Sequence, residues 1–138
     1  MIKTLDMKTL RHLSLFNKVT RIDTRFSFMY NETLFFCVPR QLISKAIGEG
    51  ARNIRRISEV VKRKIKIIPM PNSIEHIKPF IETIVSPITF KELEVRGDEV
   101  ILTAGSQSKA ALLGRNKRRL LEMQGIVGDF FNKEFKIV

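Results

Sequence analysis

One glycine turn occurs twice in this chain, as Ile47-Gly48-Glu49-Gly50-Ala51-Arg52-Asn53-Ile54 and, 66 residues later, as Leu113-Gly114-Arg115-Asn116-Lys117-Arg118-Arg119-Leu120. In each copy an apolar residue and a glycine begin the turn, basic side chains follow, and a second apolar residue ends the stretch. Helical hydrophobic spacing lies on both sides of each turn. Glycine lets the backbone approach a ligand closely, and a helix N-terminus attracts anions, so this arrangement favours binding of a phosphate backbone.

The composition of the 138 residues also favours a polyanionic partner. The formal net charge is +11 and the sequence pI is about 10.2. A hydrophobic fraction of 43% is enough for one domain or for two small ones with modest cores. Nucleic acid is therefore the favoured ligand, ahead of an anionic membrane surface.

Cysteine content and hydropathy predict where the protein works. Cys37 is the only cysteine, so no disulfide framework can form, and we expect a core thiol in a reducing, cytoplasmic location. The N-terminus lacks the continuous apolar core of a signal peptide, and no stretch approaches the roughly 18 apolar residues of a membrane span. We expect a soluble protein with no membrane partner.

The first half of the chain reads as helix, two strands, helix, turn, helix and strand. Asp6 is a candidate cap for the first helix, and Asn31-Glu32-Thr33 suits a hairpin turn. The expected elements are a helix carrying Met7, Leu10, Leu13 and Phe16, strands at 26–30 and 34–38, a helix after Pro39, a helix carrying Ile54, Ile57 and Val61, and a strand at 64–70.

The second half repeats this order after a short, stiff linker, Pro69-Met70-Pro71-Asn72, so we expect domains at 1–70 and 71–138. Its expected elements are a helix carrying Ile74, Ile77, Ile81 and Ile84, strands at 89–95 and 99–103, a helix capped by Ser106, a helix carrying Leu120, Met123, Val127 and Phe131, and a strand at 135–138. Pro79 leaves two starts open for the first of these helices, at Ser73 or at Pro79 itself. The predicted fold class is α+β, with two domains that each pack three helices on one face of a small three-stranded mixed sheet.

Two helices joined by an apolar-Gly-x-x-Gly turn beside a small sheet resemble the KH domain, which binds single-stranded nucleic acid. Strands placed before the helix pair resemble its type II form. Two such units in tandem over residues 1–138 are similar to the archaeal form of the transcription factor NusA, whose pattern is matched at residues 44–50 and 113–116. The resemblance implies a factor in transcription elongation or termination that binds single-stranded RNA, with RNA polymerase as a further partner.

The same resemblance assigns RNA binding to the turns, and the charge pattern adds their basic flanks. The candidates are Lys45, Gly48, Glu49, Gly50, Ala51, Arg52, Arg55 and Arg56 in the first half, and Lys109, Gly114, Arg115, Asn116, Lys117 and Arg118 in the second. Both turns depart from the KH pattern, because Ala51 and Lys117 replace the closing glycine. Glu49 also adds a carboxylate that repels phosphate.

Charge is divided unequally between the halves. Residues 1–70 carry 15 basic and 5 acidic side chains, whereas residues 71–138 carry 10 and 9. Half of the second set of basic residues nevertheless lies between Lys109 and Arg119, so the second turn is locally positive. A basic helix face can also be plain solvated surface, with Glu59 paired to Arg55 and Arg63.

Two alternative functions fit the same sequence: a KH protein of ribosomal RNA processing or ribosome assembly, and a protein-interaction module whose turns have degenerated. Seven aromatic residues are expected in the core rather than stacked on bases. They are Phe26, Phe28, Phe35, Phe36, Phe130, Phe131 and Phe135. His12 and His76 lie far apart in the sequence and there is only one cysteine, so no metal site is expected. The sequence also has no nucleophile elbow, phosphate-loop lysine motif or pair of catalytic acids, so we expect no cofactor, no small-molecule substrate and no enzyme activity.

Overall fold

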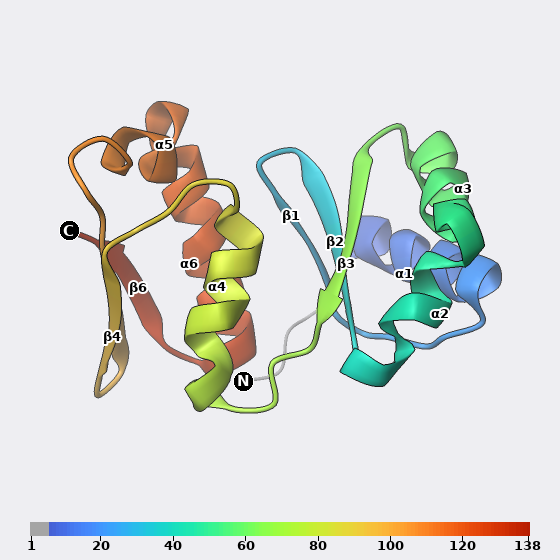
Figure 1. Cartoon of the computed structure of the whole chain (residues 1–138), viewed down its shortest axis with the longest axis horizontal. Coiled ribbons are helices and arrows are strands. Elements are labelled where there is room, and N and C mark those ends of the chain that lie inside the picture. The colour runs from blue at the N-terminus through green and yellow to red at the C-terminus, as the bar shows by residue number, and fades with distance from the viewer. Residues whose placement is uncertain (1–5) are drawn as a thin grey trace. The chain divides into compact units, whose positions relative to one another are not determined.

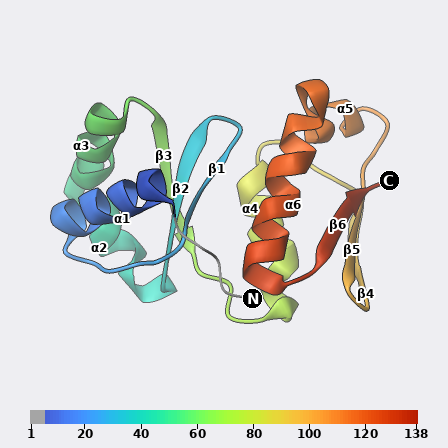
Figure 2. The ribbon, with the colours of Figure 1, turned by 180° about the vertical axis from the view of Figure 1, so that it is seen from behind.

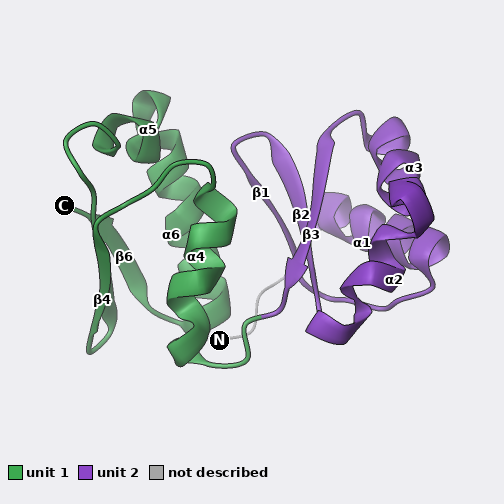
Figure 3. Cartoon of the chain, in the orientation of Figure 1, with its two compact units in different colours: residues 1–3, 71–138 green, residues 4–70 purple. Residues whose placement is uncertain are grey.

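A computed structural model describes residues 6–138 of the chain. The chain divides between Met70 and Pro71 into two compact units, shown in different colours in Figure 3. We call residues 6–70 the N-terminal unit (purple) and residues 71–138 the C-terminal unit (green). Each unit has its own sheet and its own helices.

The N-terminal unit has the element order predicted from its sequence. Its elements are α1 (Met7–Thr20), β1 (Ser27–Tyr30), β2 (Thr33–Val38), α2 (Ile43–Ile47), α3 (Arg52–Val61) and β3 (Lys64–Pro69). Strand β2 is central, antiparallel to β1 and parallel to β3. The predicted mixed sheet is therefore confirmed. Short 3-10 turns precede α2 and α3, at Arg40–Leu42 and Glu49–Ala51.

Local sequence signals explain where α1 begins and how the hairpin turns. The Asp6 carboxylate accepts a hydrogen bond of 2.7 Å from the backbone amide of Thr9, which confirms the predicted N-cap. Asn31 and Glu32 connect β1 to β2, and both have positive φ, at 49° and 60°. A two-residue turn of this kind matches the right-handed twist of the strands it joins.

The core of the N-terminal unit lies between its helices and one face of its sheet (Figure 1). The buried cluster consists of Phe16, Ile22, Leu34, Phe36, Val38, Ala46, Ile57, Ile65 and Ile67. Phe16 of α1 stacks on Phe36 of β2, with ring centroids 4.4 Å apart. Seen from behind, α1 lies on the same side of the sheet as α2 and α3, and it contacts α3 and β1 (Figure 2).

The aromatic residues of β1 and β2 are only partly as predicted. Phe28, Phe35 and Phe36 are buried, and Phe28 stacks on Phe35 at 5.0 Å, outside the cluster beneath the helices. The prediction is wrong for Phe26, which is 41% exposed, because β1 begins one residue later, at Ser27. The predicted buried face of α1 also starts too early, since both Met7 and Leu10 are exposed.

Cys37 of β2 is buried, as the sequence predicted. Burial raises the pKa of its thiol to about 12, because the thiolate would lose its hydration. The side chain therefore stays a neutral thiol and behaves as a small apolar group.

The C-terminal unit repeats the same order of elements. They are α4 (Ile77–Val85), β4 (Glu92–Arg96), β5 (Glu99–Thr103), α5 (Lys109–Leu113), α6 (Arg118–Phe131) and β6 (Glu134–Ile137). Strand β5 is central, antiparallel to β4 and parallel to β6. This second sheet is mixed as well, so the predicted α+β class with two three-stranded mixed sheets is confirmed.

Two helix starts in the C-terminal unit differ from the sequence analysis. A 3-10 turn at Ile74–His76 leads into α4 at Ile77, which places Pro79 in the first turn, where its missing amide costs no hydrogen bond. The predicted cap at Ser106 is wrong, because α5 begins at Lys109 after a turn, and no side chain caps it.

The helices of the C-terminal unit also bury their apolar faces beside the sheet. Its buried residues include Ile81, Ile84, Val100, Leu102, Leu112, Met123, Val127 and Phe135. Phe130 and Phe131 are half-buried and surround Phe80, with centroid distances of 5.0 and 5.9 Å. Over the described residues 6–138, no helix has both the length and the apolar character needed to cross a bilayer.

Candidate nucleic-acid interface

The two glycine turns share one backbone conformation. Gly48 has φ 81° and ψ 161°, and Gly114 has φ 76° and ψ 171°. Two residues further on, Gly50 and Asn116 have φ 60° and ψ 27°, and φ 57° and ψ 28°. The repeat seen in the sequence is therefore a repeat of geometry.

The same backbone hydrogen bonds hold both turns. The Gly48 amide donates to the Ser44 carbonyl and the Gly114 amide to the Ala110 carbonyl, both at 3.0 Å. A second bond closes each turn onto the glycine carbonyl, donated by the amide three residues later, at 3.0 Å in the N-terminal unit and 3.1 Å in the C-terminal unit. Each helix pair is thus joined by a rigid, internally bonded turn rather than by an open loop.

Only glycine suits the first position of each turn. Its φ and ψ fall in a region that residues with a side chain almost never adopt. A Cβ atom on Gly48 would lie 2.9 Å from the side chain of Asn53, and one on Gly114 would lie 2.5 Å from Cγ and 2.9 Å from the amide nitrogen of Arg119. The opening glycine lets the turn pass directly over the start of the next helix.

The missing closing glycine has not changed the turn. Ala51 and Lys117 have φ of 60° and 59°, in the left-handed region where glycine would be unstrained. A side chain there costs roughly 1 kcal/mol or more. The departures from the Gly-x-x-Gly pattern therefore lower the stability of the fold without changing the geometry of the turn.

Each turn leads into a helix whose N-terminus has no side-chain cap. Ala51 precedes α3 and Lys117 precedes α6, and neither side chain accepts a hydrogen bond from the helix amides. The first amide of each helix already donates to a carbonyl of the turn, Arg52 to Glu49 and Arg118 to Arg115, while the helix start as a whole carries partial positive charge. A phosphate group is a suitable acceptor for both helices.

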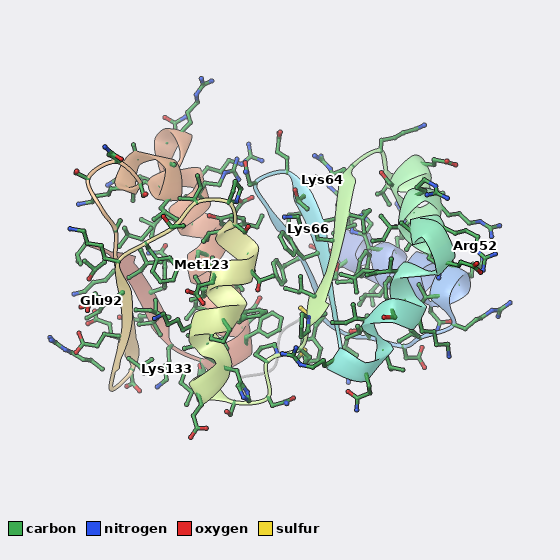
Figure 4. All side chains as sticks on the ribbon, viewed as in Figure 1. Arg52, Lys64, Lys66, Glu92, Met123 and Lys133 are labelled. Atoms are coloured by element: carbon green, nitrogen blue, oxygen red, sulfur yellow. The ribbon has the colours of Figure 1, made fainter. Side chains whose placement is uncertain are left out.

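Basic side chains surround the N-terminal turn, with one acidic exception. Lys45, Arg52, Arg55 and Arg56 are exposed, as is Glu49 within the turn. Arg52 extends outward from the start of α3 (Figure 4). Arg55 instead folds back, and its Nη1 donates to the Gly50 carbonyl.

The solvated-surface alternative proposed ion pairs between Glu59 and the arginines of α3. Within the described residues, Glu59 forms no ion pair with Arg55 or Arg63. The two neighbouring arginines of α3 nevertheless serve different places. Arg55 reaches the turn, whereas Arg56 lines a groove beside α1. Both arginines are exposed and charged.

The C-terminal turn is more strongly positive than the N-terminal one. Between Lys109 and Arg119 five side chains are basic and none is acidic. Arg115, Lys117 and Arg118 are exposed, as are Lys109 and Asn116. Arg119 is held by an ion pair with Glu122, in which both side chains are mostly buried.

Sequence analysis missed Asn53 and Arg119 as parts of the site. Each lies five residues after the opening glycine and packs against it. The Asn53 side-chain amide also donates to the Lys45 carbonyl at 3.3 Å. The repeat shows that Asn53 and Arg119 have the same spacing from Gly48 and Gly114. Because one is an amide and the other a cation, the sequence did not suggest that they play the same packing role.

The described residues provide no metal centre. No group of three histidine, cysteine or acidic side chains in residues 6–138 is arranged as ligands. His12 is half-buried, and burial lowers its pKa, with a further contribution from the charge of Lys8. His76 is exposed at the start of α4.

Comparisons with known proteins find a distant relative and a similar fold. No family model matches the chain. The probable transcription termination protein NusA of Methanococcus vannielii is 28% identical over 100 residues, which are 71% of this chain and 56% of that protein. This chain thus matches about half the length of that relative. The crystal structure of APE1850 aligns with 97% of this chain and 99% of its own, with a TM-score of 0.67 and 18% identity, and so shares the fold.

Proposed function

We propose that this chain is a transcription-related RNA-binding protein with two KH-like units, each gripping the backbone of unpaired RNA at its glycine turn. The observation that supports the proposal most strongly is the second copy. The same exposed backbone conformation, uncapped helix start and cluster of basic side chains recur 66 residues apart. Plain solvated surface would not preserve a strained backbone at both Ala51 and Lys117.

The chemistry of the turn suits phosphodiesters. The opening glycine presents backbone without a side chain, and the helix start behind it supplies amides and a positive dipole. Lys45 and Arg52 in the N-terminal unit, and Arg115 and Lys117 in the C-terminal unit, add charge that pairs with neighbouring phosphates. Such a turn holds about four nucleotides in KH modules, and their unpaired bases stay free to be read.

The transcriptional role rests on the relative from Methanococcus vannielii, whose name describes transcription termination. A factor of this type would act in the cytoplasm, on nascent RNA, with RNA polymerase as a protein partner. Binding rather than catalysis is the proposed activity. The turns carry no nucleophile and no paired acid and base; apart from the single carboxylate of Glu49, their functional groups are amides and cations.

Both turns belong to one chain, so binding at one raises the effective concentration of RNA at the other. Two weak sites then give useful affinity without either being tight. An RNA long enough to reach both turns should bind at least about tenfold better than one of half its length.

Fluorescence anisotropy with labelled RNA tests the binding proposal. We expect unpaired RNA to bind and the matched duplex to bind much more weakly. Affinity should fall with rising salt, with a slope of about 0.7 for each phosphate contacted. Equal affinity for long and half-length RNA at the same salt would contradict joint action of the turns, and salt-independent or absent binding would contradict the function itself.

Crosslinking in cells tests the role in transcription. We expect nascent transcripts and RNA polymerase subunits to be recovered with the protein. Recovery of ribosomal RNA precursors instead would favour a role in ribosome assembly with the same mode of RNA binding. Recovery of proteins without RNA would favour an interaction module with degenerate turns.

A further inference from the structure

A groove separate from the glycine turns lies between α1 and α3 of the N-terminal unit. Its volume is about 440 Å³, and six residues line it. They are Leu15, Lys18, Val19, Arg21, Arg56 and Val60. All six come from the two helices and the residue that ends α1, so the groove is complete within this unit.

The lining divides into an aliphatic part and a cationic part. Leu15, Val19 and Val60 are branched aliphatics, and Val60, in the last turn of α3, is 62% exposed. The other three lining residues are cations, and the lining contains no carboxylate. The aliphatic part is small, and the three cations beside it give the groove a charge of one sign that attracts an anionic ligand.

Positive charge continues along the pair of helices beyond the groove. His12 of α1 has its pKa lowered first by burial, and then by the charges of Lys8 and Arg63, with Asp6 acting in the opposite direction. Lys8 belongs to α1, and Arg63 follows the end of α3. Two cations and one carboxylate therefore act on this part of α1.

The lining chemistry fits a polypeptide better than RNA. It has no aromatic side chain on which a base could stack, which is the usual apolar contact with single strands. A phosphate seated against three aliphatic side chains would lose hydration without full compensation. An aliphatic side chain flanked by carboxylates satisfies both parts of the lining at once.

We propose that this groove binds an acidic amphipathic segment of a partner protein, whose aliphatic side chains enter between α1 and α3 while its carboxylates pair with Lys18, Arg21 and Arg56. A cavity of about 150 Å³ holds one benzene-sized group, so the groove has room for two or three aliphatic side chains. Such a contact is small for a protein interface, so we expect a dissociation constant in the micromolar range. Arg56 then serves protein binding rather than the glycine turn.

Peptide binding to the full-length chain tests this proposal. The probe is a labelled helical peptide of about 16 residues with leucines on one face and glutamates beside them, and its counterpart has lysines in place of the glutamates. We expect micromolar binding of the acidic peptide, and binding of the lysine counterpart at least tenfold weaker. Val60→Asp should weaken the acidic peptide at least tenfold.

Leu121→Asp is the matched control, because Leu121 is also 62% exposed on a helix but belongs to α6 of the C-terminal unit. It should leave peptide affinity unchanged. Neither variant should alter RNA affinity by more than about twofold. Since both sites are exposed, circular dichroism should show both variants folded.

Three results would overturn the proposal. The first is no detectable binding of the acidic peptide at about 100 µM, far above the expected range. Binding that is equal for both peptides, or unaffected by Val60→Asp, would place the contact elsewhere. Finally, unpaired RNA that displaces the peptide and is weakened equally by Val60→Asp would make the groove part of the RNA surface.

Discussion

The glycine turns of the two units have the same backbone and different charge. Gly48–Ala51 and Gly114–Lys117 agree in φ and ψ and in their backbone hydrogen bonds. The N-terminal turn contains Glu49, whereas the C-terminal turn has Arg115 at that position. The charge of the turn thus differs between the two units while its backbone geometry does not. The opening glycine and the left-handed pair fix the shape, and the exposed side chains set how strongly an anion is held.

Inside each turn the arginines also behave differently. Arg55 donates to the Gly50 carbonyl and so reduces the negative partial charge that the N-terminal turn presents. Arg119 is instead neutralised by Glu122, yet four further cations surround the C-terminal turn. We therefore expect the C-terminal turn to contribute more of the RNA affinity.

The largest expected effect comes from removing the opening glycine. Gly114→Ala should lower the free energy of unfolding by about 2 to 3 kcal/mol, because the backbone region excludes side chains and the added Cβ meets the backbone of Arg119. Urea unfolding followed by circular dichroism measures the change. Gly50→Ala is the control. Its φ is also positive, but nothing lies within 4 Å of the added Cβ, so the loss should be about 1 kcal/mol. Equal losses would show that close approach is not what selects glycine.

Charge reversal compares the turns directly. Arg115→Glu with Lys117→Glu should weaken RNA binding about 30-fold, which corresponds to about 2 kcal/mol. Lys45→Glu with Arg52→Glu in the N-terminal unit should cost only about fivefold, or about 1 kcal/mol. Anisotropy at fixed salt measures both.

The matched control for charge reversal is Lys78→Glu with Lys91→Glu, two exposed lysines of the C-terminal unit outside its turn. It makes the same change in net charge and should cost less than threefold in affinity, because long-range charge is screened. A larger loss in the N-terminal variant than in the C-terminal one would reverse the ranking of the turns.

Glu49→Arg should make the N-terminal turn resemble its counterpart. Removing a carboxylate and adding a cation beside the phosphate should raise RNA affinity about fivefold, roughly 1 kcal/mol for exposed charges. Glu59→Arg, exposed on α3 outside the turn, is the control for net charge. If both substitutions raise affinity equally, the carboxylate of Glu49 has no special position.

The smallest effect concerns the closing position. Ala51→Gly should raise the free energy of unfolding by about 0.5 kcal/mol, because relief of the left-handed strain is partly offset by the greater flexibility of unfolded glycine. RNA affinity should stay within twofold. Lys117→Gly should relieve similar strain but lower RNA affinity, since it also removes a cation. A destabilising Ala51→Gly would mean that the alanine methyl group makes a contact that outweighs the strain.

The parts of the fold with periodic or repeated signals could be predicted from sequence. The two hairpins, the N-cap at Asp6 and the two turns followed from patterns within one short window, whereas the mixed sheets were predicted from the whole repeated order of elements. Ser106 was misassigned because the sequence has a serine both there and at Ser108, and the pattern alone does not say which of them precedes the helix. Phe26 was misassigned because alternation does not fix the first residue of a strand.

The site was less predictable where it depends on side-chain direction or on distant contacts. Positive φ at Ala51 and Lys117 runs against residue preference, and only the bonded turn imposes it. That Arg55 reaches the Gly50 carbonyl depends on a rotamer. The groove joins residues about 40 positions apart, and no local pattern connects α1 with α3.

The burial of Cys37 makes this protein convenient for site-specific labelling. The sole native sulfhydryl is shielded and protonated in the folded state, so maleimide reagents should leave it unmodified until the chain unfolds. A cysteine introduced at one chosen surface position would then be the only reactive one under native conditions. Dyes or spin probes could be attached near each glycine turn in separate preparations, without first removing a residue from the interior.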